Sequence, residues 1–162
     1  MKRFVFLDID GVVNHDDWYY KNRVVEKNFK CGDCDPATIE RLNKLKELDV
    51  KVVISSSWGD MVDDMLFNCG LELPIVGHTE HFYEPWICRG NEVAKWLSKN
   101  VIEEHIDDEY SYVIFDDDRD FMISQLDNFV HVDRKYGLHD WHIDKAIEIL
   151  NIPSSKSLIY PK

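Results

Sequence analysis

Short apolar runs recur along the chain, and the segments between them carry apolar residues at helical spacing. Apolar runs of this length are typical of strands buried on both faces of a sheet. We expect strands at residues 3–8, 51–54, 74–76, 111–115 and 129–133. We expect helices at residues 36–48, 60–69, 89–97 and 142–150, where apolar side chains recur every three or four positions.

Strands and helices alternate, and a strand–helix–strand unit closes by a right-handed crossover into a parallel sheet. The helix after Asp35-Pro36 has a clear start, because Asp is a favoured N-cap and Pro a favoured first helical residue. This order predicts an α/β, three-layer Rossmann-like fold with a five-stranded parallel sheet, in a single domain of residues 1–162. Residues 12–34 have no clean period, and we expect them to form an inserted hairpin or flap.

Two of the predicted strands end in carboxylates. Asp8 and Asp10 end the first strand, and Asp116 and Asp117 follow the fourth. Unpaired carboxylates out of water are costly, and the carboxyl ends of parallel strands meet at one edge of a sheet. A divalent cation bound there would explain the arrangement, and an all-oxygen site suits Mg²⁺. Gly11 allows the chain to turn sharply just past the first pair of acids.

The sequence leaves open which acids of the second cluster bind the metal, because Asp116, Asp117 and Asp118 are consecutive and Asp120 follows closely. We favour Asp116 and Asp117 as metal ligands because they come first after the apolar strand. Asp120 is a candidate for an outer residue, one that supports a metal-binding side chain without contacting the metal itself.

The segment Asp8-Ile9-Asp10-Gly11-Val12 resembles the first motif of the haloacid dehalogenase-like (HAD) superfamily of phosphohydrolases. Three later features are similar to the second, third and fourth motifs in the same order. They are the serines that end the second strand, the arginine that begins the third helix, and the paired aspartates of the fourth strand: Ser55, Ser56, Arg89, Asp116 and Asp117. The resemblance covers the chain from Phe4 to about Leu150.

The resemblance implies a two-step phosphoryl transfer. Asp8 would be the nucleophile that becomes an aspartyl-phosphate, and Asp10 would be first the general acid and then the general base. Mg²⁺ would be bound by Asp8, by the backbone carbonyl of Asp10, and by Asp116 or Asp117. It also implies an HAD-like fold with a small flap in place of a cap domain.

The same resemblance assigns the phosphate-binding groups. Ser56, with Ser55 as the next choice, would hold the phosphoryl oxygens, and Arg89 would offset the negative charge of the aspartates and phosphate. Lys95 is the alternative cation, but its place in the middle of a helix is more typical of a surface lysine.

Substrate size is inferred from the short insertions, which leave no room for a large cap and predict an open site. An open site accepts a bulky phosphate ester such as a nucleic-acid end or a phosphoprotein. The minimal cap, the Asp-Asp motif and the Arg-Gly helix start are also similar to the phosphatase domains of RNA and DNA end-repair enzymes. The aromatic run Trp18-Tyr19-Tyr20 would pack within the flap. Alternatively, it would stack on a base while nearby cations meet phosphates: Lys21, Arg23, Lys27 and Lys30.

Composition narrows the range of partners and compartments. The net charge of -12 disfavours a protein that coats duplex nucleic acid by bulk electrostatics, but not one that binds an end. No long apolar segment predicts a membrane span and no export signal is recognised, so we expect a cytoplasmic protein with reduced thiols. No obligate protein partner is evident. A zinc site from Cys31, Cys34, His78 and His81 is an alternative to incidental thiols.

Three functions remain open at this point. The first is a nucleotide or polynucleotide 3′-phosphatase, and the second is a small-molecule phosphatase such as a 5′-nucleotidase. The third is a regulatory module that keeps the fold and binds Mg²⁺ without turnover. The presence of both Asp8 and Asp10 favours hydrolysis over the third function.

Overall fold

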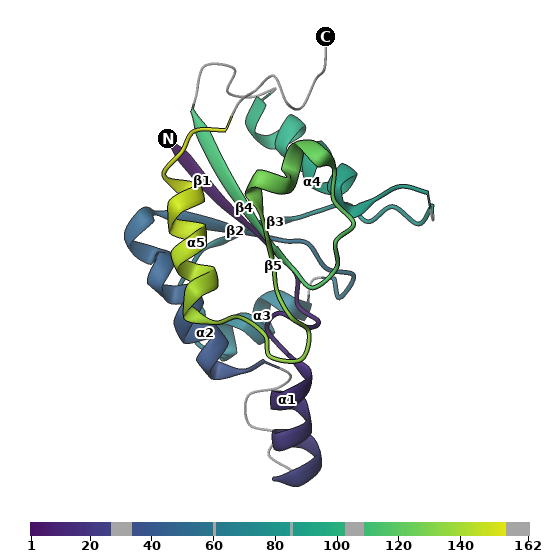
Figure 1. Cartoon of the computed structure of the whole chain (residues 1–162), viewed down its shortest axis with the longest axis vertical. Helices are drawn as coiled ribbons and strands as arrows, with labels where there is room; N and C mark the ends of the chain where they lie inside the picture. Colours follow the sequence, from purple (N-terminus) through teal and green to yellow (C-terminus); the bar gives the residue numbers. More distant parts are fainter. Residues whose placement is uncertain (27–33, 60, 85, 103–108, 155–162) are drawn as a thin grey trace.

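The computed structural model describes residues 1–26, 34–59, 61–84, 86–102 and 109–154 (Figure 1). Five strands form one parallel sheet in the order β3-β2-β1-β4-β5, which confirms the predicted α/β fold. The strands are β1 (Lys2–Leu7), β2 (Val50–Ile54), β3 (Ile75–His78), β4 (Tyr110–Asp116) and β5 (Phe129–His131).

The central strand β1 brings three distant segments to one level at the carboxyl edge of the sheet. Leu7, its last residue, pairs with Ile54 of β2 and Phe115 of β4. The residues that follow these three therefore emerge side by side. Two backbone hydrogen bonds hold them in register, from Ser55 N to Leu7 O at 2.9 Å and from Asp8 N to Phe115 O at 3.0 Å.

Helices cover both faces of the sheet (Figure 1). They are α2 (Pro36–Asn43) with the 3₁₀ turn η2 (Lys44–Leu48), α3 (Met61–Asn68), α4 (Arg89–Leu97) with η3 (Ser98–Ile102), the 3₁₀ segment η4 (Ile123–Asn128) and α5 (Asp140–Leu150). The side chains of β1 alternate between two cores. Val5 and Leu7 pack with residues of α2, α3 and α5, and Phe4 and Phe6 pack with residues of α4.

The boundaries of all five strands differ from the prediction by one or two residues, and in β4 and β5 the pairing explains the difference. β5 ends at His131 rather than at residue 133, since its partner β4 ends at Asp116, which pairs with His131. β4 begins at Tyr110, one residue early, because Tyr110 pairs with Lys2 of β1. The helix expected at 36–48 tightens to 3₁₀ geometry at Lys44.

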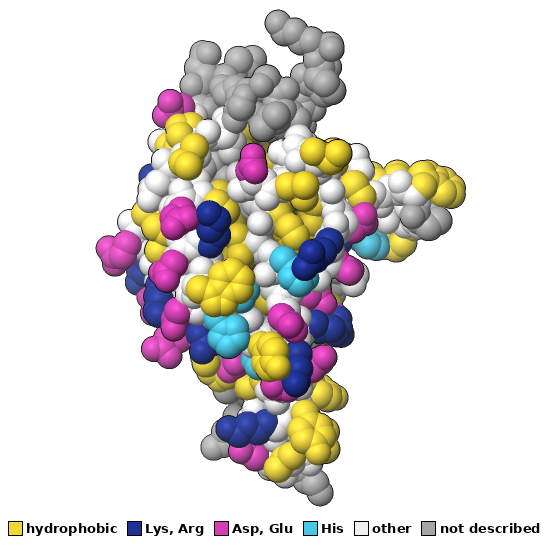
Figure 2. Space-filling model, in the orientation of Figure 1, with side chains coloured by type: hydrophobic (Ala, Val, Ile, Leu, Met, Phe, Trp, Pro, Cys, Tyr) yellow, Lys and Arg dark blue, Asp and Glu magenta, His cyan; other side chains and the backbone are white. Residues whose placement is uncertain are grey.

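The described part of the predicted flap is helical, not a hairpin. α1 (Asp16–Tyr19) and η1 (Tyr20–Val25) project from the sheet, and Figure 2 shows hydrophobic side chains on this projection. His15 caps α1 and ties its base to the domain, with Nε2 2.9 Å from Asp35 Oδ2. Tyr19 and Tyr20 are exposed, so within the described residues they do not pack inside the flap as predicted. Lys27 and Lys30 lie outside the described residues.

The zinc alternative also falls partly outside the described residues, because Cys31 is not among them. His78 contacts Asp63 at 2.9 Å, His81 contacts Glu92 at 3.1 Å, and Cys34 is buried. Among the described residues, the groups that could hold a metal ion include none with these histidines.

No helix in the described ranges combines the length and the apolar composition that a bilayer span needs.

We expect Leu42→Ala to lower the free energy of unfolding by about 2 to 5 kcal/mol, because Leu42 is fully buried between α2 and the sheet. Leu126→Ala is the matched control, since half of that side chain is exposed, and its effect should stay within about 0.5 kcal/mol. Urea unfolding of both variants measures the difference. Equal effects would contradict the assigned core.

Candidate active site

Two buried carboxylates lie side by side where β1 and β4 end. Asp8 follows β1 directly, Asp116 is the last residue of β4, and both side chains are shielded from solvent. Carboxylate oxygens of Asp8, Asp116 and Asp117 lie within 4.8 Å of one another. The sheet thus brings together acids that are about a hundred residues apart in the sequence.

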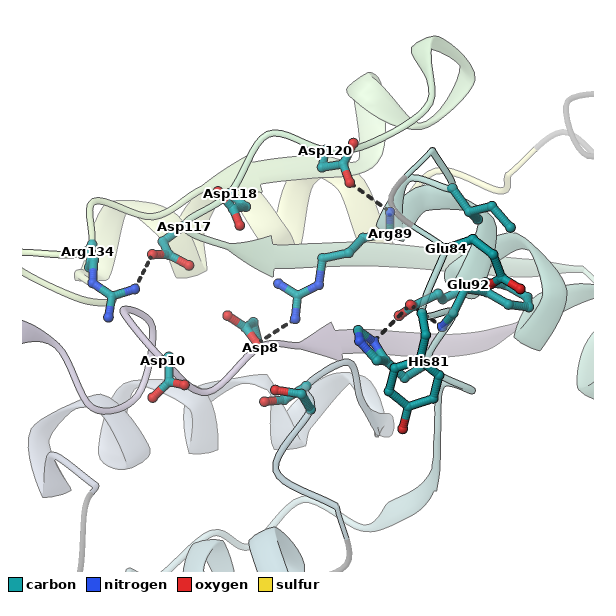
Figure 3. A pocket seen from close by; sticks show the side chains of 15 residues that line it. Asp8, Asp10, His81, Glu84, Arg89, Glu92, Asp117, Asp118, Asp120 and Arg134 are labelled. Carbon is teal, nitrogen blue, oxygen red and sulfur yellow. Dashed lines mark hydrogen bonds and ion pairs between the residues drawn. The ribbon is translucent and has the colours of Figure 1, made fainter.

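Arg89, the first residue of α4, reaches toward these acids, and Figure 3 shows its side chain next to Asp8. Its Nη2 donates to Asp8 Oδ1 at 3.0 Å, and its Nη1 donates to Asp116 Oδ2 at 2.7 Å. Nη2 also donates to the Ser55 carbonyl at 2.9 Å. Lys95, the alternative cation, pairs with Glu80 at 2.6 Å on the surface instead.

The buried acids hold their protons tightly. Burial raises the pKa of Asp116 to about 8, with the neighbouring Asp8 adding to the effect and Arg89 opposing it. Burial likewise raises the pKa of Asp8 to about 6, against the opposing charge and hydrogen bond of Arg89. One arginine therefore does not compensate both carboxylates, and this part of the sheet favours additional positive charge.

The donor set fits Mg²⁺. Asp8, Asp116 and Asp117 offer only oxygen atoms, at mutual distances that one cation can span. Gly11 approaches the same group closely: its φ is +78°, and a Cβ there would lie 2.6 Å from Asp117 Oδ2. The Asp10 carboxylate is not a member of this group, and a metal contact through its backbone carbonyl stays a prediction.

Asp10 has a defined setting of its own. Its Oδ2 accepts a hydrogen bond from Trp58 Nε1 at 2.8 Å, and its Oδ1 accepts one from Asn14 Nδ2 at 2.8 Å. The Gly11 backbone N–H donates to Asn14 Oδ1 at 3.1 Å, which orients that amide. Each oxygen of the Asp10 carboxylate thus has a donor, and the side chain is held in one orientation.

The two candidate serines have different surroundings. Ser56 lines the cavity above the acids. Ser55 is buried, and its hydroxyl oxygen has no hydrogen-bond partner among the described residues. Of the two, Ser56 is the one placed to meet a ligand directly, while Ser55 supplies its carbonyl to Arg89.

A cavity of about 510 Å³ opens over these residues. One wall comes from the segment between β3 and α4, through His81, Tyr83 and Ile87, and the opposite side carries Arg134 (Figure 3). None of the described residues of the predicted flap, 12–26, lines this cavity. Among the described residues, the segment before α4 therefore borders the acids, where the sequence prediction had placed the flap.

Sequence reasoning did not assign roles to Asn14, Trp58 or Arg134. Arg134 contacts Asp117 Oδ2 at 3.2 Å and follows the end of β5. All three residues come shortly after the carboxyl end of a strand, where ligands of parallel sheets bind, and that position is the signal that could have identified them.

Asp118 and Asp120, which belong to the second acidic cluster, contribute in two further ways. The Asp118 backbone N–H donates to Asp116 Oδ1 at 2.8 Å, which fixes the buried carboxylate. Asp120 Oδ2 accepts from the Arg89 backbone N–H at 3.2 Å, and its carbonyl accepts from Gly90 N at 3.1 Å. Asp120 thus supports the start of α4 and, through it, the position of Arg89.

The parallel sheet with acids at the ends of β1 and β4 and an arginine between them defines a HAD-like phosphatase domain. Comparison with protein-family models agrees: residues 4–143 match the family described as the HAD domain in Swiss Army Knife RNA repair proteins. The match covers most of the chain, so the chain belongs to this family, and the predicted resemblance is confirmed. Comparisons with curated proteins and with solved structures each found no match.

The raised pKa values of Asp8 and Asp116 predict that the stabilisation of the folded protein by Mg²⁺ depends on pH. The folded metal-free protein binds more protons at these groups than the unfolded chain between about pH 4 and 8, so their contribution to stability falls as pH rises through that window. We expect Mg²⁺ to raise the melting temperature more at pH 8.5 than at pH 5. Thermal unfolding in Mg²⁺ and in EDTA at both values measures this.

Asp116→Asn should stabilise the metal-free protein at pH 8.5 relative to wild type and abolish the Mg²⁺ effect. Asp140→Asn, on an exposed carboxylate, is the matched control. A Mg²⁺ effect that is equal at the two pH values, or that survives Asp116→Asn, would contradict the assignment.

Proposed function

We propose that this chain is a Mg²⁺-dependent phosphomonoester hydrolase that forms an aspartyl-phosphate on Asp8. The observation that carries the proposal is the contact of Arg89 with both Asp8 and Asp116 at the floor of an open cavity. A nucleophile, a cation for the phosphoryl oxygens and a cation-binding group of acids thus meet in one place. A regulatory module without turnover would not need the nucleophile together with a separately held Asp10.

In the first step a carboxylate oxygen of Asp8 bonds to phosphorus, and the bond from phosphorus to the ester oxygen breaks. Asp10 gives its proton to the leaving oxygen. In the second step Asp10 takes a proton from water, the water oxygen attacks phosphorus, and the bond to Asp8 breaks to release inorganic phosphate. Splitting the reaction this way returns both aspartates to their starting states.

The surrounding residues stabilise the charge that builds on the phosphoryl oxygens. Arg89 orients the Asp8 carboxylate through Oδ1 and faces the site of attack, and Ser56 offers a hydroxyl at the cavity surface. Mg²⁺ bound by Asp8, Asp116 and Asp117 would supply further positive charge at the same oxygens. Trp58 and Asn14 keep Asp10 aimed while its proton moves.

For the substrate, we propose a terminal phosphate of RNA, with the 3′-phosphate as the first choice. The family is described by its place in RNA repair proteins, and the described flap residues leave the cavity open. One observation favours the alternative of a small phosphate ester such as a mononucleotide. Seven carboxylates and only two arginines line the cavity among the described residues, which disfavours a long polyanion within it.

We expect Asp8→Asn to lower kcat by about 10³-fold or more, because the amide cannot attack phosphorus. Phosphate release with Mg²⁺ should be measured on an aryl phosphate, on 5′- and 3′-mononucleotides and on a 3′-phosphorylated oligoribonucleotide. Asp133→Asn, on an exposed carboxylate outside the cavity, should leave the rate unchanged. Failure of the wild-type protein to release phosphate from every substrate would end the proposal, and preference for mononucleotides would select the small-ester alternative.

Trp58→Phe should lower kcat by about tenfold or more with little change in KM, because it removes a hydrogen bond that orients Asp10 but keeps an aromatic ring at this position. Trp141→Phe, on the exposed face of α5, is the matched control. Steady-state kinetics on the preferred substrate would separate the two parameters. An unchanged kcat would show that Trp58 does not position the general acid.

A further inference from the structure

We propose that Tyr83 stacks on the nucleobase next to the scissile phosphate, and that the aromatic loop around it selects base-bearing substrates. The aromatic loop comprises residues 79–84 and 86–88, between β3 and α4. The inference rests on the proposed phosphatase function and adds the part of the substrate that the site recognises.

The aromatic loop exposes apolar side chains beside the active-site cavity. Tyr83 is 87% exposed and Trp86 is 81% exposed, and Figure 2 shows hydrophobic side chains gathered on the projection next to α4. Tyr83 and Ile87 also line the cavity that holds Asp8. Large aromatic side chains at the edge of a reaction site, open to solvent, have the chemistry of a stacking surface for a planar group.

The root of the aromatic loop is held firmly by α4. Glu92 is buried, and its Oε1 accepts from the Phe82 backbone N–H at 2.9 Å and contacts His81 Nδ1 at 3.1 Å. Lys95 Nζ lies 4.9 Å from the centroid of the Phe82 ring. Two residues next to Tyr83 are thus tied down, so little ordering of this root is required when a ligand binds.

His81 further defines the position of Tyr83. The two rings meet edge to face, with centroids 5.0 Å apart and an interplanar angle of 89°. This leaves Tyr83 largely exposed while its position relative to the cavity is set. Arg89 and Glu92 are one turn apart on α4, so one helix places both the phosphate-facing cation and the anchor of the aromatic loop.

The charge of the cavity explains why stacking is needed. Its lining is predominantly acidic, so phosphates other than the reacting one gain little there. Binding energy for the rest of the substrate must come from uncharged contacts, and stacking of a base on an aromatic side chain contributes about 1–3 kcal/mol. The volume of about 510 Å³ is in the range that holds a ligand of nucleotide size.

This assignment differs from the stacking surface considered from sequence. Trp18, Tyr19 and Tyr20 lie on the projecting helix, and none of them lines the cavity. Tyr20 is 63% exposed and so provides a matched control: an accessible tyrosine away from the acids.

The test compares Tyr83→Ala, Tyr83→Phe and Tyr20→Ala with wild type. The substrates are a short oligoribonucleotide with a 3′-phosphate, a 3′-mononucleotide, and the same oligoribonucleotide with an abasic 3′-terminal residue. For both base-bearing substrates, Tyr83→Ala should raise KM by about 5- to 150-fold with little change in kcat, which corresponds to the loss of one stacking contact. Tyr83→Phe and Tyr20→Ala should match wild type, and the abasic substrate should not respond to Tyr83→Ala.

A binding measurement separates this inference from the proposed function. Calorimetric titration of Asp8→Asn, with and without Tyr83→Ala, with the intact and abasic oligoribonucleotides should show the same base-dependent loss of affinity. If wild type hydrolyses nothing but Tyr83 still governs binding of the intact ligand, the phosphatase proposal fails and the stacking surface stands. If wild type is active and Tyr83→Ala affects the intact and abasic substrates equally, or neither, the stacking surface is refuted.

Discussion

Two neighbouring carboxyl groups held out of water are the constraint on which the rest of this site depends. Asp8 and Asp116 emerge from neighbouring parallel strands, and burial favours their protonated forms. Arg89 contacts both carboxylates, yet their raised pKa values show that its single charge leaves them undercompensated. A bound cation would therefore stabilise the two carboxylates. Phosphoryl transfer also requires a cation close to the carboxylate nucleophile.

The placement of Arg89 depends on a close approach of backbone segments around the start of α4. Asp120 accepts hydrogen bonds from the Arg89 and Gly90 backbone N–H groups, and Gln125 donates to the Gly90 carbonyl at 2.8 Å. A Cβ at Gly90 would lie 2.3 Å from Gln125 Oε1, so only glycine allows this contact. The same helix then anchors the aromatic loop through Glu92, which links the reaction site and the proposed base-binding surface in one rigid element.

Much of the fold could be predicted because burial on both faces leaves a direct trace in the sequence. The apolar runs of the central strands and the Asp35-Pro36 helix start correspond to β1, β2, β4 and α2. The boundaries were less predictable, because the length of β5 follows from where β4 stops pairing. The projecting helix was missed, since local capping by His15 and two acids in the first turn outweighed the absence of a clear hydrophobic period.

By itself, the sequence determined the identity of the acids, the order of the motifs and the sheet edge where they would meet. Those features depend on residue type and on strand polarity, which are local properties. Only the tertiary structure decided that Arg89 bridges Asp8 and Asp116 and that Trp58 and Asn14 hold Asp10. It also decided that the segment around Tyr83, rather than flap residues 12–26, borders the cavity. Apart from the Asn14–Asp10 hydrogen bond, these contacts join residues far apart in the chain, and their geometry follows from packing between elements, which no local pattern encodes.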